Sequence, residues 1–161
     1  MIQIGRAVVR RIEDHARDAF PEECCGFLLG SAARHRQVVD ARPAKNVAAD
    51  NRTRRYEIDP IALLRVDDVA RAKSLDLVGI YHSHPNHPAE PSEFDRSRAS
   101  GWYSYVILKI EEGTPAEMTC WRFDTTKDQF EPETIVIRPK GAADPSGGTS
   151  GPRRRSSAGE P

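Results

Sequence analysis

Apolar residues near the start of the chain recur at intervals of three and four residues, which predicts a helix with one buried face. The residues in this pattern are Val8, Ile12, Ala16, Ala19 and Phe20. Pro21 follows directly, and proline cannot continue a helix because it lacks the amide hydrogen and its ring clashes with the preceding turn. We therefore expect the first helix to end before Pro21.

Short apolar runs bounded by turn residues predict the strands of a sheet. They lie at residues 2–4, 25–31, 75–84, 103–110, 117–123 and 133–138. Residues 36–42 follow the second run closely enough to be its hairpin partner, and turns at 111–115 and 125–129 are expected to join the last three strands.

Two further helices begin at residues that are typical helix caps. Asp59 offers a capping oxygen and Pro60 a preset first turn to a helix that we expect to run to about Lys73, and Ser92 begins the other. Residues 46–55 are polar and without period, which predicts a mobile surface loop that could contact a substrate. The pattern as a whole predicts a mixed α+β fold, with one mixed sheet and about three helices packed on it.

Composition changes after Arg138, where the chain contains Gly, Ser, Pro, Ala and charged residues but no large apolar one. Such a segment cannot bury enough apolar surface to fold, so residues 140–161 are predicted to be a disordered tail. A chain of 161 residues normally forms one domain, and we place that domain at residues 1–139.

Charge and cysteine content limit which binding partners and which cellular compartment we expect. The 24 Lys and Arg balance the 24 Asp and Glu, which does not favour nucleic acid or an anionic membrane as partner. No apolar run approaches the roughly 20 residues that span a bilayer. The three cysteines are an odd number in a chain too large to need disulfides, so we interpret them as buried thiols and expect a cytoplasmic protein.

The candidate chemistry lies in the segment "GIYHSHPNHPAEPSEFD", residues 79–95. Side chains two residues apart on a strand point to the same face, so His82 and His84 can bind one ion. Prolines at 85, 88 and 91 stiffen the loop that leads to Asp95, which can supply a third ligand. Two imidazoles, one carboxylate and an open position for water make up a typical catalytic zinc site.

Such a site also needs a base, and the chemistry alone leaves Glu22 and Glu23, just before the strand at 25–31, as equal candidates. Ordinary structural explanations exist for each residue. The two histidines could be hydrogen-bonded core residues, and Ser92 with Asp95 fits a short version of the capping box. His87 and Glu90 are expected to be exposed loop residues. The metal hypothesis depends on the two histidines, the stiff turn, Asp95 and an upstream glutamate occurring together.

The segment resembles a known family. "HSHPNHPAEPSEFD" matches the JAMM motif, which is His-x-His-Pro, six residues, Ser, two residues and Asp, and "ECCGFLLG" is similar to the Glu-x-Cys-Gly strand entry of the same proteins. These are the MPN-plus metalloproteases, or JAB domains, and the resemblance covers nearly all of residues 1–139. It implies a curved mixed sheet related to the cytidine-deaminase-like fold.

The resemblance also implies roles for individual residues. His82, His84 and Asp95 would bind one Zn²⁺, Glu23 would be the general base and then the acid, and Ser92 would donate a hydrogen bond that helps hold the water or the developing oxyanion. This choice resolves the ambiguity between Glu22 and Glu23 in favour of the second.

The family hydrolyses amide or isopeptide bonds, and small bacterial members are associated with ubiquitin-like sulfur-carrier proteins. The expected activity is therefore hydrolysis after the C-terminal Gly-Gly of such a carrier, with release of cysteine or a short extension. Alternatives are a deconjugating isopeptidase and a non-catalytic scaffold that binds a ubiquitin-like partner. A zinc nucleoside deaminase is disfavoured because the chain has no Cys-x-x-Cys pair.

Overall fold

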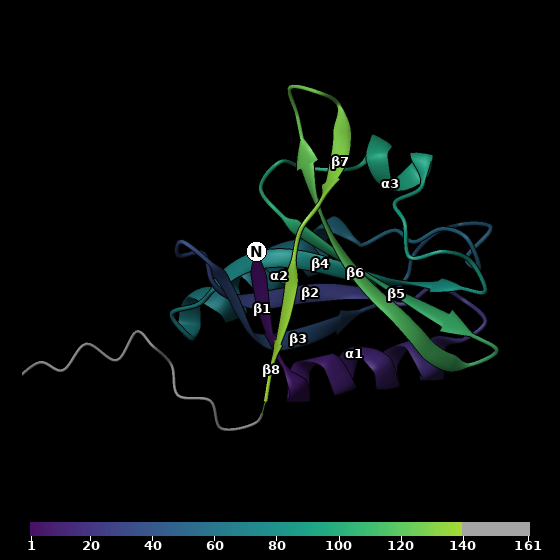
Figure 1. The fold of residues 1–161 in the computed structure, drawn as a ribbon, viewed down its shortest axis with the longest axis horizontal. Helices are drawn as coiled ribbons and strands as arrows, with labels where there is room; N and C mark the ends of the chain where they lie inside the picture. The colour runs from purple at the N-terminus through teal and green to yellow at the C-terminus, as the bar shows by residue number, and fades with distance from the viewer. Residues whose placement is uncertain (140–161) are drawn as a thin grey trace, which may run out of the picture.

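The computed structural model describes residues 1–139, which form an eight-stranded mixed sheet with three helices (Figure 1). The elements in chain order are β1 (Ile2–Gly5), α1 (Arg6–Ala19), β2 (Cys25–Ser31), β3 (Arg36–Ala44), α2 (Pro60–Ala72), β4 (Asp76–Pro85), α3 (Glu93–Ser97), β5 (Ser104–Glu111), β6 (Thr114–Asp124), β7 (Gln129–Pro132) and β8 (Ile135–Arg138). The predicted mixed α+β class is confirmed. The predicted tail, 140–161, lies outside the described residues.

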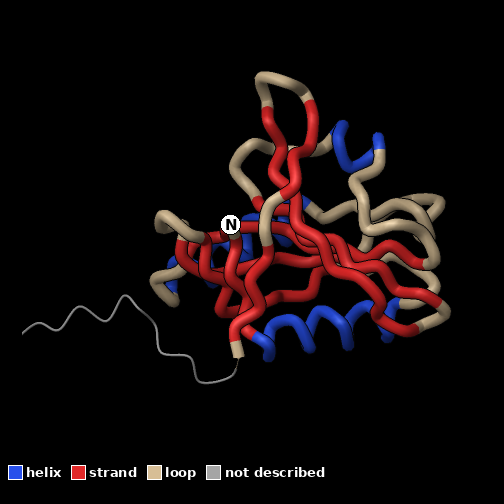
Figure 2. The backbone as a smooth tube through the Cα atoms, in the orientation of Figure 1, coloured by secondary structure: helices blue, strands red, loops and turns tan. Residues whose placement is uncertain are grey.

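The strands are ordered β7-β6-β5-β4-β2-β3-β1-β8 across the sheet, which is strongly twisted and curled (Figure 2). β4 lies in the middle, parallel to β5 and antiparallel to β2. The predicted hairpin of β2 with β3 is confirmed, since the two strands pair antiparallel from Cys25 and Ala44 to Ser31 and Gln37.

The sheet buries a core on each face, because the strands at its centre are apolar on both sides. α1 lies along one face (Figure 1), where Val8, Ile12 and Ala16 pack with residues of β4 and β5. α2 covers part of the opposite face, where Val66 and Ala70 contact a smaller cluster of β2 and β4 residues. His82, Ser83 and His84, near the carboxyl end of β4, are also buried.

Local chemistry explains where the helices begin. The Asp59 side chain accepts a hydrogen bond from the Ile61 amide at 2.8 Å, with Pro60 in the first turn, as predicted. Ser92 caps α3, and Asp95 completes a capping box, also as predicted.

The described residues include no helix that is both long enough and apolar enough to cross a membrane. Cys24, Cys25 and Cys120 are free and buried.

The end of the domain differs from the prediction. We expected the turn at 125–129 to lead directly to the strand at 133–138. The chain instead enters β7 after that turn and pairs with β6, and β8 lies at the far edge of the sheet, parallel to β1. Pro132 ends β7, since proline cannot donate the next ladder hydrogen bond. Glu133 then anchors the crossing chain by accepting a hydrogen bond from Ser104 Oγ at 2.6 Å.

Gly26 in β2 lies close to atoms of both neighbouring strands, β3 and β4. A Cβ atom at this position would lie 2.5 Å from the Arg42 carbonyl oxygen and 2.5 Å from the ring of Tyr81, which is fully buried. The Tyr81 hydroxyl in turn lies 2.9 Å from His15 Nδ1 on α1. The glycine therefore lets an aromatic ring fill the space between β2, β4 and α1.

Candidate metal centre

The carboxyl end of β4 holds the two predicted histidine ligands side by side. His82 and His84 are each 1 % exposed, and their Nε2 atoms lie 3.0 Å apart. Asp95 lies beside them, with Oδ1 3.4 Å from His82 Nε2 and Oδ2 3.7 Å from His84 Nε2. In a tetrahedral site with metal–ligand bonds of about 2.0 to 2.1 Å, two ligand atoms lie about 3.4 Å apart. The separations between the three side chains are close to this value, so they would fit around one small cation.

The orientation of each imidazole is set by a different contact. His84 Nδ1 lies 2.6 Å from the Pro88 carbonyl oxygen and donates to it, which leaves Nε2 with a free lone pair directed at the cluster. His82 stacks against Tyr56, with ring centroids 4.5 Å apart. Tyr56 was not predicted as part of the site, because it follows the irregular polar loop and its stacking on His82 depends on how that loop folds.

Asp95 reaches the histidines because Ser92 caps the start of α3. The Ser92 amide and hydroxyl donate to Asp95 Oδ2 at 2.7 and 2.6 Å, and the Asp95 amide donates to Ser92 Oγ at 3.1 Å. Burial opposes ionisation of Asp95, but the adjacent His82 and hydrogen bonds with His82, His84 and Ser92 outweigh it and lower the pKa of the carboxyl. The serine that caps the helix therefore also contributes, with the two histidines, to keeping the predicted ligand Asp95 ionised.

The pairing of β2 with β4 decides which of the two glutamates faces this cluster. Cys25 pairs with His82, and a further backbone hydrogen bond extends the pairing toward the end of β4. Because side chains alternate, Glu23 falls on the same face as His82 and His84. Glu23 is 2 % exposed, with Oε1 3.9 Å from His84 Nε2, whereas Glu22 is exposed to solvent.

The surroundings of Glu23 favour the protonated form of its carboxyl group. Burial raises its pKa to about 8, and Oε1 has no hydrogen-bond partner among the described residues. The loop predicted at 46–55 holds its backbone: the Glu23 amide donates to the Arg52 carbonyl at 2.7 Å, and Asn46 Nδ2 donates to the Glu23 carbonyl at 3.1 Å. This loop thus lies against the cluster.

The expectation for His87 is wrong, whereas Glu90 is exposed as expected. The His87 side chain is only 12 % exposed, its ring stacks on His84 at 4.1 Å, and Nε2 lies 3.6 Å from Glu23 Oε1. Burial, with smaller effects of neighbouring histidines and Arg54, lowers the pKa of His87 to about 4. The polar and proline-rich composition of the loop between β4 and α3 suggested that His87 is exposed. The loop instead folds back over the end of β4, where its main chain contacts His84 and β6.

Two backbone carbonyls fix the loop between β4 and α3. Besides the contact of Pro88 with His84, the carbonyl oxygen of Ala89 accepts from Thr119 Oγ1 at 2.6 Å and from Trp121 Nε1 at 3.3 Å, both on β6. Ala89 is 1 % exposed. The loop is therefore held between β4 and β6 by its main chain.

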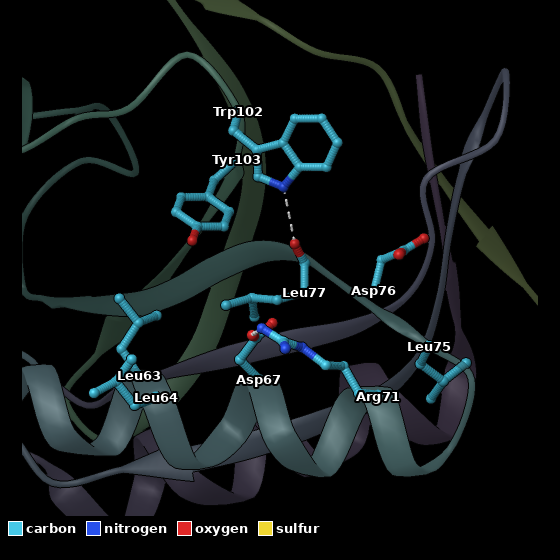
Figure 3. A pocket seen from close by; sticks show the side chains of 9 residues that line it. All are labelled: Leu63, Leu64, Asp67, Arg71, Leu75, Asp76, Leu77, Trp102 and Tyr103. Carbon is cyan, nitrogen blue, oxygen red and sulfur yellow. Dashed lines mark hydrogen bonds and ion pairs between the residues drawn. The ribbon is translucent and has the colours of Figure 1, made fainter.

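A hollow of about 160 Å³ adjoins Asp95 and is lined in part by Tyr56, Phe94 and Tyr105. A second hollow, of about 390 Å³, lies between α2, the start of β4 and the segment before β5, where the Trp102 indole donates to the Leu77 carbonyl at 3.1 Å (Figure 3). None of the predicted site residues lines the second hollow, so it is separate from the histidine cluster.

A protein-family model matches most of the chain. The model describes prokaryotic homologs of the JAB domain, and it matches residues 5–124. The chain belongs to this JAB family. The match begins at the end of β1 and ends with β6, so it contains both segments that form the cluster.

Named relatives of this JAB protein include a desampylase from Haloferax volcanii, which is 42 % identical over 130 residues, covering 78 % of this chain and 88 % of the relative. A probable TtuB-protein conjugate cleaving protease from Thermus thermophilus is 33 % identical over 108 residues, covering 67 % of this chain and 70 % of the relative. Among solved structures, a protein from Desulfitobacterium hafniense superposes with a TM-score of 0.76 at 28 % identity, covering 87 % of this chain and 94 % of the other.

Proposed function

We propose that this JAB protein is a zinc-dependent peptidase that hydrolyses the amide bond after the C-terminal Gly-Gly of a ubiquitin-like sulfur-carrier protein. The product would be the carrier with a free Gly-Gly end, together with cysteine or a short extension. The observation that carries the proposal is the convergence of His82, His84 and Asp95 within 3.7 Å of one another, with the Glu23 carboxylate 3.9 Å from His84.

The donor set fits one zinc ion per chain. Two neutral imidazoles and one carboxylate are the ligands of many catalytic zinc sites, and their spacing here matches the tetrahedral value. The buried Glu23 Oε1 has no hydrogen-bond partner among residues 1–139, which further supports binding of an ion and its water beside it. When bound, zinc supplies a Lewis acid that polarises the scissile carbonyl and lowers the pKa of water toward about 7.

Glu23 would accept a proton from the attacking water and then return it to the leaving nitrogen. Burial raises the affinity of its carboxylate for a proton, which suits a group that must take up a proton and release it again. Ser92 would assist by a hydrogen bond to the developing oxyanion. Its hydroxyl donates to Asp95 in this structure, so that assistance requires the hydroxyl to turn toward the substrate.

Burial of the centre supports a slender substrate. The four side chains around it are between 1 % and 7 % exposed, so a bulky residue would not bring its carbonyl to them. A Gly-Gly tail has no side chains and can approach in extended form. The hollow beside Asp95 offers a route along Tyr56.

The names of the relatives favour a closely related second candidate. The Thermus thermophilus relative is named for cleaving TtuB-protein conjugates, so the leaving amine for this chain could belong to a lysine of another protein. The chemistry of Glu23 and the histidines would be the same for an isopeptide bond.

Substitution of Glu23 by Gln tests the proposal, with the exposed neighbour Glu22→Gln as matched control. The substrates would be one carrier ending in Gly-Gly plus a short extension and one isopeptide conjugate, with products weighed by mass spectrometry and zinc measured in the purified protein. We expect Glu23→Gln to retain one zinc but to cleave about 10²- to 10⁴-fold more slowly, because general acid and base catalysis contributes about that much.

His82→Ala should lose both zinc and cleavage. Normal cleavage by Glu23→Gln would refute the assignment of the base. A wild-type protein that binds the carrier but cleaves neither substrate when loaded with zinc would instead be a non-catalytic scaffold.

A further inference from the structure

Three buried polar atoms in or beside the histidine cluster lack hydrogen-bond partners among the described residues, namely His82 Nδ1, Glu23 Oε1 and His87 Nε2. Of these, Glu23 Oε1 and His87 Nε2 lie 3.6 Å apart. Buried polar groups are nearly always paired with protein, water or an ion, so two such atoms facing each other indicate a place for a further group.

The spacing of these atoms suits a cation. A separation of 3.6 Å is close to the roughly 3.4 Å between two ligands of a tetrahedral zinc ion, and a carboxylate with an imidazole is a common zinc-binding pair. Ligand atoms of Glu23, His84 and His87 all lie within 4.8 Å of one another.

His84 cannot serve two ions at once. Its Nδ1 is occupied by the Pro88 carbonyl, and its Nε2 already faces His82 and Asp95 in the first cluster. A second ion would therefore have Glu23 and His87 as its protein ligands, with water in the remaining positions. With two protein ligands in place of three, it should bind more weakly than the first.

We propose that Glu23 and His87 form a second, weaker zinc site next to the first, and that an ion bound there inhibits hydrolysis by occupying the Glu23 carboxylate. The inhibition rests on the proposed function, because it requires Glu23 to be the base. The second site itself rests only on the geometry. A carboxylate bound to zinc cannot accept the proton of the attacking water, so activity should fall as free zinc rises beyond the amount that fills the first site.

Metal binding tests the site without reference to activity. Wild-type protein is dialysed against increasing free zinc, and bound zinc per chain is measured by mass spectrometry of the metal. We expect a first ion that binds tightly and a second that binds at higher zinc. His87→Phe keeps an aromatic ring against His84 but removes the ligand atom, so it should stop at one ion.

Two further variants keep the test decisive. Glu23→Gln should also stop at one ion, which covers the case in which His87→Phe fails to fold. The exposed His35→Phe should still bind two, because it removes a histidine outside the cluster. A second ion that persists in both His87→Phe and Glu23→Gln, or wild-type protein that never exceeds one ion, would overturn the second site.

Activity measured across the same zinc series tests the inhibition. When the free zinc concentration is ten times the dissociation constant of the second ion, about one-tenth of the wild-type rate should remain. The rate of His87→Phe should not fall over the same range of zinc concentrations. If the second ion binds while the wild-type rate stays constant, the inhibitory role is wrong. A protein that takes up the second ion but never cleaves would contradict the proposed function and leave the site intact.

Discussion

Replacement of Ser92 by alanine should reveal whether this serine acts on Asp95 or on the substrate. In the structure its hydroxyl donates to Asp95 Oδ2 at 2.6 Å and accepts from the Asp95 amide at 3.1 Å. Both contacts are lost in Ser92→Ala, whereas the hydrogen bond from the Ser92 amide to Oδ2 at 2.7 Å remains. The variant therefore loosens the Asp95 carboxylate without removing it.

The size of the effect follows from these two contacts. Loss of a helix N-cap costs about 1 kcal/mol. Loss of a hydrogen bond to a charged acceptor costs about 1.5 to 3 kcal/mol, and water can replace little of it because Asp95 is 7 % exposed. A total of about 3 kcal/mol should lower the melting temperature of the zinc-free protein by roughly 10 °C. Partners that orient a metal ligand typically change metal affinity about 10- to 100-fold, so zinc should bind more weakly by that factor.

The assay combines thermal melting of the zinc-free protein, zinc affinity by competition with a chelator, and cleavage at saturating zinc. Ser92→Thr, which keeps the hydroxyl and can cap the helix, is the matched control and should resemble the wild type. If Ser92→Ala melts and binds zinc as the wild type does but cleaves slowly, our reasoning about Asp95 is refuted, and the hydroxyl acts on the substrate instead.

Two further predictions concern the core around the site. Gly26→Ala should destabilise the domain by about 1 to 3 kcal/mol in chemical denaturation, because its Cβ would lie 2.5 Å from backbone and ring atoms. Gly5→Ala, whose Cβ would meet nothing within 4 Å, should not destabilise it by overpacking, and equal losses in both would contradict the steric explanation. Burial lowers the pKa of His15 below its ordinary value of 6.5, so the unfolded chain binds a proton more readily than the folded one and stability should fall as pH drops below about 6.5. His15→Gln should remove that part of the pH dependence of the free energy of unfolding, whereas the exposed His35→Gln should retain it.

Much of the site geometry could be predicted because it depends on local periodicity. The alternation of side chains along a strand places His82 and His84 on one face, and Ser92 marks the start of the short helix that carries Asp95. The family resemblance selected Glu23 over Glu22. The structure gives an independent physical reason, since the register of β2 against β4 turns Glu23 inward.

The features that could not be predicted depend on contacts between distant segments. His87 looks like an exposed loop residue, and its burial becomes visible only when the loop is placed beside Thr119 and Trp121 of β6. The stacking of Tyr56 on His82 likewise depends on how the loop before α2 folds. The position of β8 beside β1 is a third case, because an apolar run carries no information about which strand it will pair with.

The main-chain anchoring of the loop between β4 and α3 has a consequence for natural variation and for engineering. Pro88 and Ala89 hold His84 and β6 through carbonyl oxygens, which every amino acid possesses. Point substitutions at Pro88 can therefore preserve the anchor, whereas inserting or deleting a single residue would move both carbonyls out of register. Homologous proteins that share this architecture should accordingly diverge in the identity of the loop residues sooner than in their number.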